Sequence, residues 1–170
     1  MQPITSLFTS VVVAASLLAG AGAASAAAVV KTQPPCLGPC ASFTPTNPIG
    51  ALPAVRSFVF AAPSKGTAIV TFHGRLFCRN SDASPNSFTL YSQIVEGGAS
   101  ANEDGPGGAV MVFSLEPNQD TTLNLASTRV FVIAAAGPKV YRFRIVRHQM
   151  FANTSCAIFD SAAFTVNFIP

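Results

Sequence analysis

The stretch that decides the fold is Ala68–Arg79, which reads AIVTFHGRLFCR. Every second residue in it is apolar or small, and these residues are Ala68, Val70, Phe72, Gly74, Leu76 and Cys78. The residues between them are mixed and mostly polar. A period of two is typical of a β-strand that buries one face. The stretch therefore predicts a half-buried strand with Cys78 on its buried side.

Further short strands are predicted around this stretch, because from Arg56 onward apolar or alternating segments are separated by turn residues. These segments are Ser57–Ala62, Ser87–Val95, Ala109–Leu115, Thr122–Ser127, Arg129–Ala135, Lys139–Arg147, Ser155–Phe159 and Ala163–Ile169. The fourth and fifth can also be one bent strand. Eight or nine strands over about 115 residues predict an all-β fold, an antiparallel, jelly-roll-like β-sandwich over residues 56–170. The chain has 14 Phe residues, a supply that fits the core of such a sandwich because buried aromatic rings remove a large area from water.

Composition limits the classes of function. The chain has 170 residues, a length typical of one domain, and only 10% of them are charged, which excludes a disordered chain. The formal net charge of +3 is too small to indicate nucleic-acid binding, so no nucleic-acid partner is predicted.

The first 30 residues contain no Lys, Arg, Asp or Glu and include the apolar run Val11–Leu18. Small residues follow, with an A-x-A site at Ala24–Ala26. This pattern predicts a signal peptide over residues 1–26, cleaved after Ala26, and a secreted or periplasmic protein without a stable membrane span. The alternative is a retained anchor, although the Gly- and Ala-rich second half is weakly hydrophobic for a span.

Residues 27–55 are predicted to form a Pro-rich arm or linker. Six of the 25 residues in Lys31–Val55 are Pro, which removes amide donors and forbids a helix. The sequence leaves open whether this arm packs on the domain.

The four cysteines are Cys36, Cys40, Cys78 and Cys156. An even number after an export signal predicts two disulfides, with three possible connectivities. Because Cys36 and Cys40 flank the turn-forming residues 37–39, we expect them to close a local loop and Cys78 to pair with Cys156. The alternative, a zinc site, is disfavoured because no His lies near the first two cysteines, and no metal or cofactor is predicted.

Two segments are apolar on both faces, whereas a sandwich strand usually has one wet face. They consist of Val110, Met111, Val112 and Phe113, and of Val130, Phe131, Val132 and Ile133. We expect either another subunit or the Pro-rich arm to cover them, since an exposed apolar band is a liability on a monomer.

No constellation of residues indicates catalysis, so the protein is predicted not to be an enzyme. The only imidazoles are His73 and His148, and no Ser lies in a G-x-S-x-G elbow. The only adjacent carboxylates, Glu103 and Asp104, lie in a Gly-rich loop rather than on facing strands.

Basic residues are better grouped. Arg75 and Arg79 share one face of the central strand, and Arg142 and Arg144 share the outward face of another. If the two strands belong to one sheet, the four side chains form a cationic stripe suited to phosphate or sulfate groups. The alternative is a row of solvated side chains that keep the sheet soluble.

The late part of the chain resembles the C1q/TNF-like jelly-roll domains, in a bacterial-type secreted form. The resemblance lies in Thr121–Arg129 (TTLNLASTR), Gly137–Phe143 (GPKVYRF) and the closing Ala163–Pro170 (AFTVNFIP). It implies a domain that forms trimers, binds proteins or carbohydrates and is not an enzyme. In place of the collagen-like stalk of the eukaryotic members, this chain has its Pro-rich arm.

Together these features predict an exported, non-catalytic β-sandwich module for binding or self-assembly. The expected partners are further copies of the same chain, in a homo-oligomer such as a trimer. The alternative is a monomeric module that binds a carbohydrate or a polyanion. The absence of Trp weighs against a sugar platform. A hydrolase is the third possibility.

Overall fold

The computed structural model describes residues 28–36, 41–43, 54–99, 108–149 and 154–170. These residues form nine strands and no helix. The strands are β1 (Val29–Thr32), β2 (Ala41–Phe43), β3 (Ala54–Ala62), β4 (Gly66–Asn80), β5 (Asn86–Glu96), β6 (Ala109–Leu115), β7 (Asp120–Ile133), β8 (Gly137–Gln149) and β9 (Thr154–Ile169). The predicted signal peptide lies outside the described residues.

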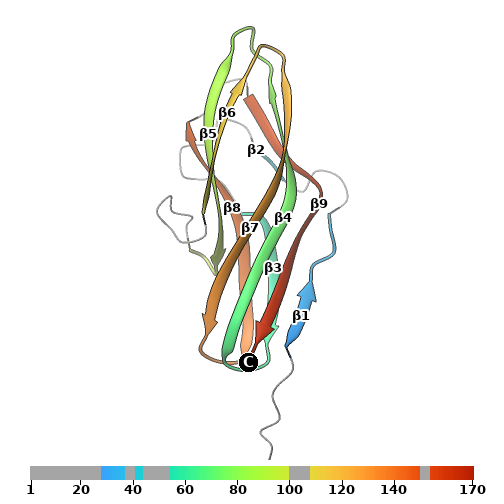
Figure 1. Cartoon of the computed structure of the whole chain (residues 1–170), viewed down its shortest axis with the longest axis vertical. Coiled ribbons are helices and arrows are strands. Elements are labelled where there is room, and N and C mark those ends of the chain that lie inside the picture. Colours follow the sequence, from blue (N-terminus) through green and yellow to red (C-terminus); the bar gives the residue numbers. More distant parts are fainter. Residues whose placement is uncertain (1–27, 37–40, 44–53, 100–107, 150–153) are drawn as a thin grey trace, which may run out of the picture.

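The nine strands form two antiparallel sheets that pack into an elongated sandwich (Figure 1). The five-stranded sheet has the order β1-β9-β4-β7, and β2 pairs with another part of β9. The four-stranded sheet has the order β3-β8-β5-β6. The predicted all-β sandwich is confirmed.

The central strand β4 has the face pattern that its sequence predicts. Ala68, Val70, Phe72, Leu76 and Cys78 are completely buried. The strand pairs with β7 on one side over an unbroken register and with β9 on the other. Because β4 has a neighbour on each side, its pleat fixes which side chains of the five-stranded sheet enter the core.

Aromatic rings from the two sheets meet in the core. Phe72 stacks on Phe143 with ring centroids 3.8 Å apart, and Phe60 lies 5.7 Å from Phe168. Each of these contacts joins one sheet to the other. Such pairs contribute roughly 0.5–1.5 kcal/mol each beyond the area they bury, which explains the use of the many Phe residues.

Two predicted strand pairs are each a single long strand. Thr122–Ser127 and residues 129–133 of the predicted segment Arg129–Ala135 belong to β7, and Ser155–Phe159 and Ala163–Ile169 belong to β9. In β9 a bulge places residues 160–162 opposite Gly74, because Ala163 pairs with His73 while Phe159 pairs with Arg75. The bulge lets both halves of β9 stay in register with β4.

Part of the Pro-rich arm belongs to the sandwich. β1 and β2 both pair with β9. The Gln33 backbone N–H donates to the Phe164 carbonyl in the five-stranded sheet at 2.8 Å, and its side-chain amide donates to the Ser57 carbonyl in β3 at 2.8 Å. Arg56 donates to the Gln33 side chain and to the Pro34 carbonyl. This segment therefore packs on the domain and connects the two sheets, which the sequence left open.

The predicted disulfide between Cys78 and Cys156 is confirmed. The two residues are direct partners in the β4–β9 ladder, with Cα atoms 4.1 Å apart, and both are buried. Cys36 is also disulfide-bonded. Cys40 lies outside the described residues, so the Cys36–Cys40 pairing stays a prediction.

Candidate functional site

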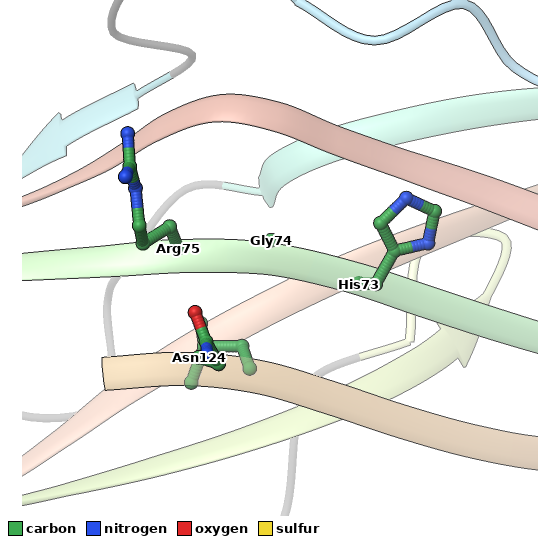
Figure 2. A pocket seen from close by; sticks show the side chains of 5 residues that line it. His73, Gly74, Arg75 and Asn124 are labelled. Atoms are coloured by element: carbon green, nitrogen blue, oxygen red, sulfur yellow. The ribbon is translucent and has the colours of Figure 1, made fainter. Parts of the chain in front are cut away.

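An open depression of about 420 Å³ lies on the outer face of the five-stranded sheet. It is lined by His73, Gly74, Arg75, Asn124 and Leu125. Figure 2 shows the His73, Arg75 and Asn124 side chains on the same side of β4 and β7. Gly74 lies beside the β9 bulge, where an added Cβ would be 3.1 Å from the Ala162 side chain. The close approach of the two strands therefore favours glycine at this position.

The depression offers an imidazole, a guanidinium and an amide, which can donate hydrogen bonds to a small polar group. Its lining includes no carboxylate and no Ser or Cys nucleophile. Within the described ranges, no group of three or more His, Cys, Asp or Glu side chains could hold a metal ion. The Arg75 side chain also has an interaction partner within the protein. These residues alone do not define a site.

The predicted cationic stripe of four arginines is wrong. Arg75 and Arg79 lie on β4 in the five-stranded sheet, whereas Arg142 and Arg144 lie on β8 in the four-stranded sheet. Their outward faces are on opposite sides of the sandwich. Strand order depends on long-range pairing, which the alternation within each strand does not specify.

Arg79 is accounted for by an ion pair on its own sheet. Its Nε lies 3.4 Å from Oδ1 of Asp120, its direct partner on β7. Both side chains are exposed, so the pair contributes about 0.2–1 kcal/mol. This is the solvated arrangement that the sequence offered as the alternative.

Arg142 and Arg144 are half-buried on the outward face of β8. Arg142 lies between Ser57 of β3 and Val95 of β5 in the sheet, and Arg144 lies beside Gln93 of β5. The Nε of Arg144 is buried and has no hydrogen-bond partner among the described residues. Residues two apart on a strand are about 7 Å apart, a separation at which two positive charges repel by roughly 0.6 kcal/mol in water and more near a protein surface.

The two doubly apolar segments lie on edge strands. On β6, Val110 and Val112 face outward and are 63% and 77% exposed, while Phe113 is buried in the core and Met111 packs against it. Of the predicted interface residues in this segment, Phe113 belongs to the core of its own chain.

On β7, Val130 and Val132 face outward and are 59% and 85% exposed, while Phe131 and Ile133 are buried in the core. Among the described strands, β7 pairs with β4 alone. The described part of the Pro-rich arm pairs with β9, on the other side of β4, and does not cover these valines. The four exposed valines of β6 and β7 are therefore what remains of the predicted interface at the surface.

An uncharged surface extends from the two β7 valines across the outward face of the five-stranded sheet, over β4 and β9 to β1. Strand register places uncharged residues side by side on it, and they are Val130, Val132, Thr67, Ile69, Asn167, Ile169, Val30, Thr128, Thr71, Thr165 and Thr32. The hydroxyl groups of Thr71 and Thr128 are 3.1 Å apart. We call this set the Val/Thr face. Its composition allows close approach of another uncharged surface without placing charges together.

A buried polar network lies at the disulfide end of the sandwich, within the loop predicted over Asn80–Asn86. The Asn80 side-chain amide donates to the carbonyls of Ser84, Leu115 and Glu116. Its Oδ1 accepts from the Asn86 side chain at 2.7 Å. The network ties this loop to the end of β6. The sequence marked these residues only as a loop, because the partners come from distant strands.

Tyr141 places its hydroxyl in the core, where the oxygen has no hydrogen-bond partner among the described residues. Burial, and secondarily the negative charge of Glu96, raises its pKa to about 12. Desolvation disfavours the phenolate, so the ring stays neutral over the ordinary pH range. The ring packs against Phe131 with centroids 4.9 Å apart.

No protein-family model matches this sequence, and no curated protein matches it. Among solved structures, the chain is similar to a protein of the T13 particle of IBDV, an icosahedral virus, with 12% identity and a TM-score of 0.37. The match covers 82% of this chain but only 31% of that chain, so this protein spans about a third of its length. We draw nothing about function from a similarity of this size. No family model supports the C1q/TNF-like resemblance, which stays a prediction, and the β-sandwich is shown by the two sheets themselves.

Among the described residues, none belongs to a helix with the length and hydrophobicity needed to cross a membrane.

Proposed function

We propose that the protein is an exported, disulfide-stabilised β-sandwich module that self-assembles through strand β7. The observation that carries this proposal is the edge position of β7 together with the exposure of Val130 and Val132. An unprotected edge strand presents unpaired N–H and C=O groups and is a template for pairing with another chain. The Cys78–Cys156 disulfide supports an oxidising compartment, which agrees with the predicted export signal.

β7 is the longest edge strand of the described chain, with 14 residues and no Pro. The other edges are shorter or obstructed. β1 has 4 residues and is followed by Pro34 and Pro35, β6 has 7 residues, and the start of β3 is bound by the Gln33 segment. Short edges and prolines are the usual protections against edge pairing. β7 is therefore the edge best suited to pair.

The central charged residue of β7 does not block this edge. Arg129 points inward, where its Nη1 donates to the Ile94 carbonyl at 2.7 Å. Its guanidinium also lies 4.9 Å from the centroid of the Phe131 ring. Because Arg129 already has these partners, pairing of the β7 backbone with another strand would not leave a newly buried, unpartnered charge.

The partner that fits this edge is a second copy of the chain. Two β7 strands pairing antiparallel around a two-fold axis would join two five-stranded sheets into one, with each strand satisfying the other's free backbone groups. The valines and the adjoining Val/Thr face are uncharged and therefore self-compatible. The trimer implied by the C1q/TNF-like resemblance is the alternative assembly.

The test is the absolute mass of the exported, oxidised protein, measured by light scattering on a sizing column. We expect a dimer for the wild type and a monomer for the double variant Val130→Lys/Val132→Lys. Val59→Lys is the matched control, because Val59 is 62% exposed on the edge strand β3, and it should stay dimeric. A wild-type monomer at all concentrations, or a dimer that survives the β7 substitutions, would refute the proposal. A trimer would favour the alternative assembly.

A second candidate function, binding of an anionic ligand, is favoured by Arg142 and Arg144 of β8, because the buried Nε of Arg144 has no hydrogen-bond partner among the described residues. That the protein is not an enzyme stays a prediction.

A further inference from the structure

Arg142 and Arg144 stand on a rigid part of the molecule. Their strand, β8, lies inside the four-stranded sheet, paired with β3 on one side and β5 on the other. Their β5 neighbours Val95 and Gln93 are both buried. The two side chains therefore start from a backbone that is fixed on both sides, with a spacing set by the strand.

Three other arginines of the described chain each have a partner. Arg56 binds the Gln33 side chain, Arg79 binds Asp120, and Arg129 binds the Ile94 carbonyl. By contrast, no described residue forms a hydrogen bond or ion pair with either guanidinium of the β8 pair, and the Nε of Arg144 is buried without an acceptor. Two adjacent, half-buried cations without acceptors are unfavourable in isolation and become favourable when an anion is present.

We propose that Arg142 and Arg144 form a binding site for an oxyanion, a sulfate or phosphate group, held between the two guanidinium groups. A guanidinium presents planar N–H donors in a fork that matches the spacing of oxyanion oxygens, and charge-assisted hydrogen bonds of this kind are strong. Ser57, the exposed β3 neighbour of Arg142, adds a hydroxyl donor beside the pair.

This site is independent of the proposed self-assembly. It lies on the outer face of the four-stranded sheet, whereas β7 and the Val/Thr face belong to the five-stranded sheet. Loss of anion binding should therefore leave the mass of the assembly unchanged, and a monomeric β7 variant should still bind the anion. Failure of one proposal can thus be told from failure of the other.

The test measures the affinity of the full, oxidised protein for inorganic sulfate, titrated at constant ionic strength against chloride, and for heparin as a sulfated polymer. We expect Arg142→Gln/Arg144→Gln to weaken both affinities at least about tenfold. The matched control is Arg75→Gln/Arg79→Gln, which removes the same charge from the opposite face and should change them less than about twofold. Equal losses in the two variants would show a general charge effect and overturn the proposal.

The two probes distinguish the source of the oxyanion. If sulfate and heparin both bind and compete with each other, the site recognises the oxyanion group itself. If heparin alone binds, the site recognises a polymer that carries sulfate groups. A wild type that binds neither probe overturns the proposal.

A stability measurement keeps the test decisive if a variant folds poorly. Because Nε of Arg144 has no acceptor, we expect Arg144→Met to raise Tm while weakening sulfate binding at least about tenfold. A purely structural Arg144 would show the opposite, a lower Tm with unchanged affinity. If no Arg144 variant folds, the single variant Arg142→Gln tests the proposal. An unchanged affinity for sulfate in that variant would refute a site formed by both arginines.

Discussion

Cys78 and Cys156 lie directly opposite each other in the β4–β9 ladder and are joined by a disulfide that spans 78 residues of sequence. The bond connects the central strand of the five-stranded sheet to the last strand of the chain. It therefore fixes the register of the pairing on which β1 and β2 also depend.

Removing this bond should destabilise the protein substantially. In the chain-entropy account, a loop of this length restricts the unfolded chain by about 4 kcal/mol. We expect Cys78→Ser/Cys156→Ser to lose roughly that amount of unfolding free energy, measured by urea denaturation of the oxidised protein. A loss below about 1 kcal/mol would show that the strand pairing alone maintains the fold.

Asn80 should be among the least replaceable polar residues. Asn80→Ala would remove the hydrogen bonds that its amide donates to the carbonyls of Ser84, Leu115 and Glu116. Asn86 would lose one of its three acceptors and would keep Asp82 and Thr154. We expect a loss of about 2–4 kcal/mol in urea denaturation. Asn124→Ala is the control, because Asn124 is exposed on β7, and it should change stability by less than about 0.5 kcal/mol. Equal effects of the two substitutions would contradict the role of the network.

Gly66 should not tolerate a side chain. A Cβ at this position would lie 2.3 Å from the Ile169 carbonyl oxygen and 2.8 Å from the Pro170 Cα, so backbone atoms would have to move. We expect Gly66→Ala to lower the free energy of unfolding by about 1–3 kcal/mol. Gly98→Ala, which meets nothing within 4 Å, should be nearly neutral. If Gly66→Ala left the free energy of unfolding unchanged, the end of β9 at Ile169 and Pro170 would be able to move away from β4 without loss of stability.

Tyr141 should make stability fall at alkaline pH. Its pKa is raised from 10.0 to about 12 in the folded protein. The unfolded chain therefore loses its proton first, so the contribution is complete below pH 10 and is lost as the pH rises through about 12. Urea denaturation between these values should show the decline, and Tyr141→Phe should reduce it. That variant should also be as stable as wild type or more so at neutral pH, because it removes an unpartnered buried hydroxyl. A large loss would indicate a partner for the hydroxyl.

The face pattern of single strands could be predicted from the sequence, because the pleat is a local property. The alternation in Ala68–Arg79 gives the buried side of β4 correctly, and the same holds for Tyr141 and Phe143 of β8. The partner of Cys78 was also predictable, since the close spacing of Cys36 and Cys40 suggested that they pair with each other.

Sheet membership could not be predicted in this way. Arg79 and Arg142 both point outward, as their strands indicate, but β4 and β8 lie in different sheets. Likewise, Val29–Thr32 is a strand only because β9 lies beside it, and the prolines that follow conceal it in the sequence. Pairing between residues more than a hundred positions apart has no local signal.

The position of β9 has a consequence for the order in which the strands can pair during folding. If the protein is exported, as we propose, its amino end emerges first, so β1, β2 and one side of β4 gain their partner only after β9 has emerged. Until then the five-stranded sheet exists only as the β4–β7 pair. Truncation of the chain within β9 would therefore remove more than one strand of the sandwich. It would deprive β1, β2 and β4 of a hydrogen-bonded neighbour at the same time.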